Sequence, residues 1–256
     1  MNFLTSLWDR MLFLLSAPKC VRCGELLIYG NKALCNACLH EHLNDIEREC
    51  SRCNKKLRFC TCSNFYLEAN KIKSVIKLYR YNSKNKDLPG NRLIYALKHA
   101  YRSDVIEYLA SELAIAICNA IDIAGNETKY IVTNVPRRKK AIVRDGYDHS
   151  AELAREVAKN LGVKYIQLLS SKTERAQKEM TGSERKSNVK FELLPRCPDI
   201  AGATVILVDD IITTGSSIVA ATKKLRILKP KSVLAASIAI AYKDSCIKPI
   251  FKFQYK

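Results

Sequence analysis

Apolar residues recur every three or four positions in several segments beyond about residue 66, which is the spacing of amphipathic helices. The clearest segment is "DVIEYLASELAIAICNAI", Asp104 to Ile121, and "LIYALKHAY" shortly before it has the same pattern. Ser150 to Gly162 predicts a helix with serine at its N-cap and glycine at its end. Another helix is predicted from Ser217 to Pro230, where the proline stops it.

Short runs of aliphatic and β-branched residues alternate with these helices and predict strands. They are "KYIVTNVP" (129–136), "ATVILVDD" (203–210) and "KSVLAASIAIAY" (231–242). Tyr79 to Ser103 combines turn residues with bases and predicts a hairpin, or a strand followed by a helix. Near-continuous apolar strands that alternate with helices favour a parallel sheet covered on both faces, so the sequence predicts an α/β fold.

The first 65 residues differ from the rest, because they are rich in cysteine and lack long periodic segments. We therefore expect two domains, residues 1–65 and residues 66–256. Within the first, Met11 to Cys20 is too short to span a bilayer, and Asp9 interrupts any leader-like pattern. We interpret this segment as an amphipathic helix that packs on its own domain. No other stretch is long and apolar enough to span, so we expect a cytoplasmic protein.

Eight of the eleven cysteines lie in four pairs, "CVRC", "CNAC", "CSRC" and "CTC". In a reducing compartment such pairs indicate metal rather than disulfides. Two thiolates separated by two residues aim at one ion, and two such pairs complete a tetrahedral zinc site. One structural zinc site is predicted, and a second whose last pair has a narrower spacing; spacing alone does not fix which pairs combine. The expected ligands are Cys20, Cys23, Cys35, Cys38, Cys50, Cys53, Cys60 and Cys62.

The remaining histidines and cysteines of interest are assigned structural roles. His40 and His42 could replace a cysteine ligand, but we expect both on the outside of a helix that follows Cys38. The solitary cysteines are interpreted as small buried hydrophobic residues; they are Cys118, Cys197 and Cys246. Zinc would supply the core that a segment of about 45 residues cannot build.

The segment "VILVDDIITTGSS", residues 205–217, carries the strongest chemical signal. A buried strand delivers Asp209 and Asp210 at its carboxyl end, where ligands bind in open α/β sheets. Gly215 permits a positive φ or a close backbone approach, and the following helix presents its amino terminus to anions. The hydroxyls that surround this turn belong to Thr213, Thr214, Ser216 and Ser217. Carboxylates beside an anion cradle suit a sugar phosphate, and a divalent ion would offset their repulsion.

Rival nucleotide motifs are absent. The chain has no Gly-x-x-x-x-Gly-Lys-Ser/Thr and no Gly-x-Gly-x-x-Gly after a strand. The acidic motif instead resembles the ribose-phosphate signature of type I phosphoribosyltransferases, which bind 5-phosphoribosyl 1-pyrophosphate with magnesium. The resemblance implies that Asp209 and Asp210 hold the ribose hydroxyls and that residues 213–217 hold the 5′-phosphate. It also implies that the parallel sheet is of the phosphoribosyltransferase type.

Two further loops complete the resemblance. The basic loop in "NVPRRKKAIVRDGYDHSAELA" is suited to pyrophosphate; its candidate residues, together with Lys98, are Arg137, Arg138 and Lys139. A polar loop supplies Arg175, Gln177, Arg185 and Asn188. With the cysteine pairs in front, the chain resembles the ComF family, competence-associated proteins with an N-terminal zinc ribbon. In an active enzyme of this type, Arg175 and Arg185 would join the two aspartates in catalysis.

The chain departs from the family pattern at "DGYDH". Where the family commonly has Arg-Gly-Phe-Asn-Gln, Asp145 replaces the arginine, and Asp148 and His149 replace the amides. Arg144 lies one position earlier and could substitute for the missing arginine. His149 could carry a proton, but a helix-capping or hydrogen-bonded structural role is favoured.

The formal net charge of +18 indicates anionic partners. Lys71 to Lys86, Lys129 to Arg144 and Lys223 to Lys231 contain many bases and no acid. Each run alone is typical of a solvated face, but together they exceed what one sugar phosphate needs. Several tyrosines near the first run could stack on unpaired bases or lie in the core; they are Tyr66, Tyr79, Tyr81, Tyr95 and Tyr101.

Two functions follow from these observations. The first is a ComF-like factor of DNA uptake that binds single-stranded DNA and a ribose phosphate, in contact with proteins of the uptake machinery. The second is an active phosphoribosyltransferase that transfers phosphoribose to a free base and releases pyrophosphate. A base-specific enzyme should carry a pocket that selects the base, and none is identifiable, which favours the first. A scaffold that docks onto a helicase or pore is a third possibility.

Overall fold

The computed structural model describes residues 18–27, 33–82, 84–121, 123, 128–171 and 191–241. Within them, five parallel strands form a sheet of order β1-β7-β6-β2-β3. Their bounds are Val75–Tyr81 (β1), Tyr130–Asn134 (β2), Lys164–Tyr165 (β3), Thr204–Ile212 (β6) and Ser232–Ala241 (β7). The predicted α/β fold with a parallel sheet is confirmed. Two short strands, Leu169–Ser171 (β4) and Phe191–Leu193 (β5), form a separate antiparallel pair.

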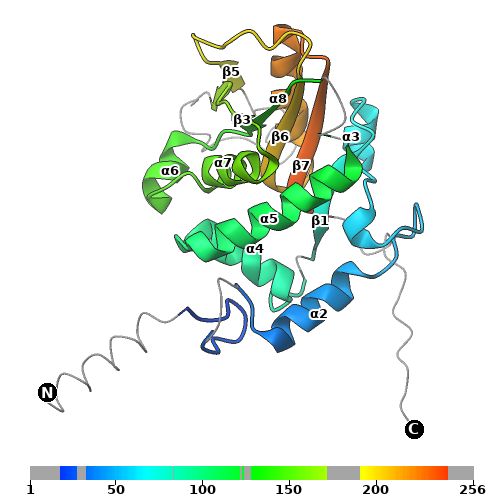
Figure 1. Ribbon diagram of the computed structural model, residues 1–256, viewed down its shortest axis with the longest axis vertical. Coiled ribbons are helices and arrows are strands. Elements are labelled where there is room, and N and C mark those ends of the chain that lie inside the picture. The colour runs from blue at the N-terminus through cyan, green and yellow to red at the C-terminus, as the bar shows by residue number, and fades with distance from the viewer. Residues whose placement is uncertain are drawn as a thin grey trace, which may run out of the picture.

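Helices cover both faces of the five-stranded sheet (Figure 1). Pro89–His99 (α4), Ser103–Ala120 (α5) and His149–Leu161 (α7) share one hydrophobic core with one face. Ser216–Leu225 (α8) and the short helix Phe65–Ala69 (α3) share another core with the opposite face. The remaining described helical elements are Asn36–Ile46 (α2), Lys139–Asp145 (α6) and the 3-10 turns Leu57–Phe59 (η1) and Arg226–Leu228 (η3).

Most predicted elements are present, with shifted ends. The helix expected from Ser150 starts at His149, and its N-cap is Asp148, whose carboxylate accepts from the backbone N–H groups of Ser150 and Ala151. Serine was the wrong cap because its hydroxyl donates to the Val135 carbonyl instead, at 2.9 Å. Gly162 ends this helix as predicted, with φ of 65°.

Two predictions about single residues are wrong. Cys118 is exposed rather than buried, because it lies on the outer side of α5 near its end, and Cys197 is only partly buried. His42 is buried rather than outside, because α2 turns it against the ring of Tyr79, 5.1 Å away. His40 is exposed as expected. Cys246 and residues 11–17 of the N-terminal segment lie outside the described residues. No described helix has the length and apolar character that a membrane crossing requires.

Candidate functional site

The acidic pair lies where two neighbouring strands send their chains to opposite faces of the sheet. β2 and β6 are paired up to Asn134 and Val208. Beyond this point the chain after β2 continues to α7 on one face, whereas the chain after β6 continues to α8 on the other. Such a switch point opens a crevice at the carboxyl ends of the strands. Asp209 and Asp210 are the next two residues of β6, so they lie at this switch point.

The carboxylate of Asp210 contacts one basic side chain from each of two helices, α4 and α7. Its Oδ2 lies 2.8 Å from His149 Nε2 and 3.0 Å from Lys98 Nζ. Burial alone would raise the pKa of Asp210, but the contacts with His149 and Lys98 hold it well below its usual range. The Nδ1 of His149 is buried and has no partner among the described residues. The predicted structural role of His149 agrees with these contacts, although Asp210 was not foreseen as its partner.

Asp209 has the opposite environment. Burial and the neighbouring charge of Asp210 raise its pKa well above the usual range, and its Oδ1 accepts from the N–H of Asp210 at 3.0 Å. The two adjacent carboxyl groups therefore share their charge unequally, which reduces the repulsion between them. Together they offer acceptor oxygens at the crevice, and a ligand with neighbouring hydroxyl groups can donate to both.

The loop after β6 turns directly into α8. Gly215 has φ of 89°, the left-handed conformation that favours glycine. Thr214 Oγ1 lies 3.0 Å from Ser216 Oγ and accepts from the N–H of Ser216 at 3.3 Å. Thr213 and Thr214 are exposed, and Ser216 and Ser217 are partly buried. Free N–H groups at the start of a helix, with hydroxyls beside them, form an anion-binding surface.

The basic loop after β2 contains the helix α6, and its charges are partly neutralised within the loop. Arg137 is ion-paired with Asp145 at 2.5 Å and donates to the Tyr147 carbonyl at 3.1 Å. Arg144 also binds Asp145, at 2.7 Å, and the two guanidinium groups hold the pKa of Asp145 well below its usual range. Asp145, which departs from the family pattern, thus holds Arg137 within the loop. Arg138 and Lys139 remain exposed.

The structure brings Lys98 and His149 together with the acidic pair. Tyr147 donates its hydroxyl to the Leu97 carbonyl, which ties the basic loop to the end of α4 beside Lys98. Arg175, Gln177, Arg185 and Asn188 lie outside the described residues.

The eight paired cysteines form two groups that could each hold a metal ion. They combine sequentially, Cys20, Cys23, Cys35 and Cys38 in the first group and Cys50, Cys53, Cys60 and Cys62 in the second. Within each group the sulfur atoms lie within 4.8 Å of one another. In the first, Cys23 and Cys35 Sγ are 3.7 Å apart, close to the ~3.8 Å expected for tetrahedral zinc with Zn–S bonds of about 2.3 Å. All eight are free thiols, so both groups fit zinc.

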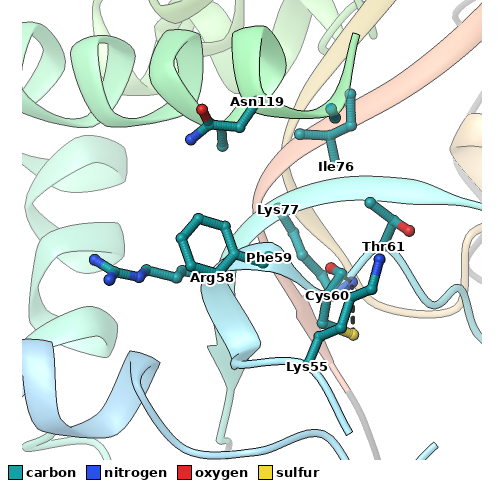
Figure 2. A pocket seen from close by; sticks show the side chains of 10 residues that line it. Lys55, Arg58, Phe59, Cys60, Thr61, Ile76, Lys77 and Asn119 are labelled. Carbon is teal, nitrogen blue, oxygen red and sulfur yellow. Dashed lines mark hydrogen bonds between the residues drawn. The ribbon is translucent and has the colours of Figure 1, made fainter. Parts of the chain in front are cut away.

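The second cysteine group is packed against β1 by two buried cations. Arg80 donates to Cys50 Sγ at 2.9 Å, and Lys77 Nζ donates to the Cys60 and Cys62 carbonyls at 2.5 and 2.9 Å. Burial alone would raise the pKa of Cys50, but nearby backbone N–H groups and Arg80 lower it to about 6. Figure 2 shows Lys77 beside Cys60 at the wall of a cavity of about 270 Å³. The anionic sulfurs are therefore compensated from the sheet itself.

These contacts also change the interpretation of the first basic run. Lys77, Arg80 and Tyr79 are buried, so they are not part of a solvated face. Tyr66, Tyr95 and Tyr101 are exposed, and Tyr81 is partly buried.

Comparison with known proteins bears on the second half of the chain. Residues 146–255 match the phosphoribosyl transferase domain. This part of the chain is therefore similar to a phosphoribosyltransferase domain. Its sheet is that of the type I phosphoribosyltransferase fold, and the resemblance recognised in the sequence is confirmed at this level.

Two curated relatives match parts of the chain. DNA utilization protein YhgH of Escherichia coli K12 is 25% identical over 132 residues, which are 51% of this chain and 58% of YhgH. The ribose-phosphate pyrophosphokinase of Methanopyrus kandleri is 42% identical over 82 residues, 32% of this chain and 24% of that enzyme. The chain thus spans less than two thirds of either relative. Among solved structures, an adenine phosphoribosyltransferase is 20% identical and covers 55% of this chain and 72% of its own, with a TM-score of 0.38.

Proposed function

We propose that this protein is a ComF-like factor of DNA uptake or use, which binds a ribose phosphate through its phosphoribosyltransferase domain and also binds single-stranded DNA. The expected small ligand is 5-phosphoribosyl 1-pyrophosphate with Mg²⁺. The observation that carries the ribose-phosphate part is the position of Asp209 and Asp210 at the β2–β6 switch point, directly before the Gly215 loop and the start of α8.

Each group has a distinct part in binding. The two carboxyl groups accept hydrogen bonds from the ribose hydroxyls, and the hydroxyls and N–H groups of residues 213–217 hold the 5′-phosphate. Lys98 and the exposed Arg138 and Lys139 contribute positive charge toward the pyrophosphate. Mg²⁺, when bound, would neutralise part of the pyrophosphate charge.

Ligand binding is favoured over catalysis by the state of the basic loop. Arg137, a candidate for stabilising the leaving pyrophosphate, is held by Asp145 at 2.5 Å and by the Tyr147 carbonyl. An enzyme that relies on charge stabilisation of the leaving group needs such a guanidinium to face the ligand. Transfer of phosphoribose to a free base is therefore the second candidate function. It is supported by the match to the phosphoribosyl transferase domain.

The DNA part of the proposal is supported by charge and by the YhgH similarity. Exposed lysines attract phosphates without regard to sequence, and exposed tyrosines such as Tyr95 and Tyr101 offer faces on which bases stack. Zinc at the two cysteine groups is assigned a structural role, because each group is built only of thiols and leaves no position for a substrate.

Calorimetric titration of the purified protein with 5-phosphoribosyl 1-pyrophosphate and Mg²⁺ tests the site. The double variant Asp209→Asn/Asp210→Asn is expected to bind at least about tenfold more weakly, because a charged acceptor such as Asp210 contributes about 1.5–3 kcal/mol. Asp199→Asn, at an exposed turn before β6, is the matched control and should bind as the unaltered chain does. Equal affinity of all three proteins would contradict the site assignment.

Fluorescence anisotropy with labelled single-stranded DNA over a salt series tests the second part. We expect micromolar or tighter binding that weakens steeply as salt rises, since phosphate contacts release counterions. Absence of DNA binding at moderate salt, combined with pyrophosphate release in a screen of free bases, would establish the transferase instead.

A further inference from the structure

The segment that joins the second cysteine group to β1 lies against the loop between β6 and α8. Asn64 is the N-cap of α3, and its Oδ1 accepts from the N–H of Leu67 at 2.9 Å. Its Nδ2 donates to the backbone carbonyls of Thr214 at 3.2 Å and Thr213 at 3.5 Å. Because both ends of this amide are engaged, its orientation is fixed, and it holds two carbonyls of the predicted phosphate loop.

The side chain of Leu67 packs against the same loop at Gly215. This side chain is fully buried, and it leaves no space for a Cβ atom at Gly215, which would lie 2.7 Å from Leu67 Cδ2. The left-handed backbone of Gly215 therefore rests directly on a side chain of α3. Contact from a packed side chain restricts which loop conformations are possible.

The other end of the segment is tied to the second cysteine group. Arg52 lies between Cys50 and Cys53, and it donates to the Ser63 carbonyl and to Glu68 Oε1, both at 2.6 Å. Ser63 Oγ donates to the Lys73 carbonyl at 3.2 Å, which joins the segment to the residues before β1. A continuous set of hydrogen bonds thus runs from the cysteine turn through residues 63–68 to Thr213 and Thr214.

The first cysteine group makes contacts in a different part of the molecule. Arg22, between Cys20 and Cys23, donates to the Asp87 carbonyl at 2.9 Å, and the Lys19 carbonyl accepts from Arg102 at 2.7 Å. These contacts reach the ends of α4 and α5 rather than the loop after β6. The two groups therefore provide an internal comparison for any effect on the loop.

We propose that Asn64 is a positioning residue for the phosphate loop, and that residues 63–68 couple metal binding at the second cysteine group to phosphate binding at residues 213–217. The phosphate half of this inference rests on the proposed function. A metal ion fixes the cysteine turn that carries Arg52, Arg52 fixes the segment, and Asn64 with Leu67 fixes the loop. By linkage, an anion that orders the loop must strengthen metal binding by the same factor.

Hydrogen exchange of the amides of residues 213–217, followed by mass spectrometry, tests the coupling without any ligand. Asn64→Asp keeps the acceptor that caps α3 but removes the donor to the two carbonyls. We expect loop exchange to rise by roughly two- to tenfold, the factor that corresponds to loss of one or two hydrogen bonds. Arg52→Gln should raise it similarly. Arg58→Gln is the matched control, because Arg58 is comparably exposed but pairs with Glu47 and should leave the loop unchanged.

A second measurement follows zinc release to a chelator, with and without 5-phosphoribosyl 1-pyrophosphate and Mg²⁺. The sugar phosphate should slow release from the second group in the unaltered chain and have little effect in Asn64→Asp. If the sugar phosphate does not bind the unaltered chain at all, the proposed function fails, whereas the exchange experiment still decides the coupling. Unchanged loop exchange in Asn64→Asp and Arg52→Gln would overturn it. An equal increase in Cys23→Ser, in the first group, would do the same.

Discussion

Both cysteine groups consist of four thiols, yet they are built into the molecule differently. In the first group Cys23 is exposed, and the nearby cation is Arg22, which pairs with Glu41 and reaches Cys38 Sγ at 3.7 Å. In the second group the cations are Lys77 and Arg80, both buried and both on β1. Water can screen Cys23 in the first group, whereas two buried cations of the sheet lie beside the second.

This difference follows from the charge of a zinc–thiolate centre. Four thiolates and one Zn²⁺ carry a net charge of −2, and burying an uncompensated charge is costly. In the first group Cys23 is the exposed ligand, and water lowers the cost at that thiolate. The second group is placed against a strand, so two cations from that strand balance it. Because its charge is compensated by cations of β1, the second metal centre and the sheet should stabilise each other.

The second group also protects an edge of the sheet. β1 is the outer strand beside β7, and an exposed edge strand invites pairing with other chains. Here the Val75 N–H donates to the Thr61 carbonyl at 2.9 Å, and Cys62 forms an antiparallel bridge with Ser74. The cysteine group thus covers the start of the strand whose cations compensate it.

The largest expected effect comes from removing one ligand of each group. Cys50→Ser should lower the free energy of unfolding by about 3–5 kcal/mol, because it leaves the buried Arg80 without its anionic partner. For a domain of this size that corresponds to a fall in Tm of roughly 10 °C. Cys23→Ser, at the exposed ligand of the first group, should shift the main transition by less than about 3 °C. Calorimetry with zinc analysis measures both, and equal shifts would contradict the comparison.

The next effect concerns the cations rather than the ligands. Arg80→Met and Lys77→Met should each weaken zinc binding at the second group by roughly 10–100-fold, the usual range for groups that support metal ligands. Arg22→Met, at the first group, should change zinc affinity by less than about threefold, since Arg22 is partly exposed and also serves Glu41. Native mass spectrometry during chelator titration counts the zinc ions retained. Similar losses in all three variants would show that burial of the cation does not matter.

The sequence predicted the cysteine groups and the sheet, but not the contact between them. Cysteine spacing and strand periodicity are local signals, whereas Lys77 and Arg80 meet Cys60 and Cys50 across 17 and 30 positions. Taken alone, their run predicts a solvated face, as a charged run usually does. One signal was available: two cations lie within the apolar strand "VIKLYRY", shortly after a thiolate-rich segment, and buried cations need buried anions.

The candidate site shows the same division. The acidic motif and the hydroxyl loop are contiguous, so their proximity follows from sequence. The partners of the motif come from elsewhere: His149 is 61 positions from Asp210, and Asn64 is 150 positions from Thr214. The sequence analysis did not predict the ion pair between Asp145 and Arg137. An acid in place of the family arginine does indicate that a nearby basic residue can pair with it.

The smallest expected effect concerns two neighbouring carboxyl groups. The charge of Asp210 is compensated by Lys98 and His149, whereas Asp209 has no such ion pair among the described residues. Asp210→Asn should reduce the free energy of unfolding by about 1–3 kcal/mol at pH 7, since Lys98 and His149 lose an ionised partner. The pKa of Asp210 is lowered by folding. Its stabilisation is therefore present above the pH where the unfolded chain ionises, about pH 4, and is lost as the pH falls through the folded value. The deficit of this variant should shrink in acid.

Asp209→Asn should behave in the opposite way. Folding raises the pKa of Asp209, so the unaltered chain loses stability as the pH rises from about 4 through the folded value. Asparagine does not titrate, so this variant should match the unaltered chain near pH 4 and become more stable than it toward pH 7, by up to about 1 kcal/mol. Urea unfolding at several pH values measures both variants. Equal losses of stability in both variants at pH 7 would contradict this prediction. They would show that Lys98 and His149 do not make the ionised form of Asp210 more favourable than that of Asp209.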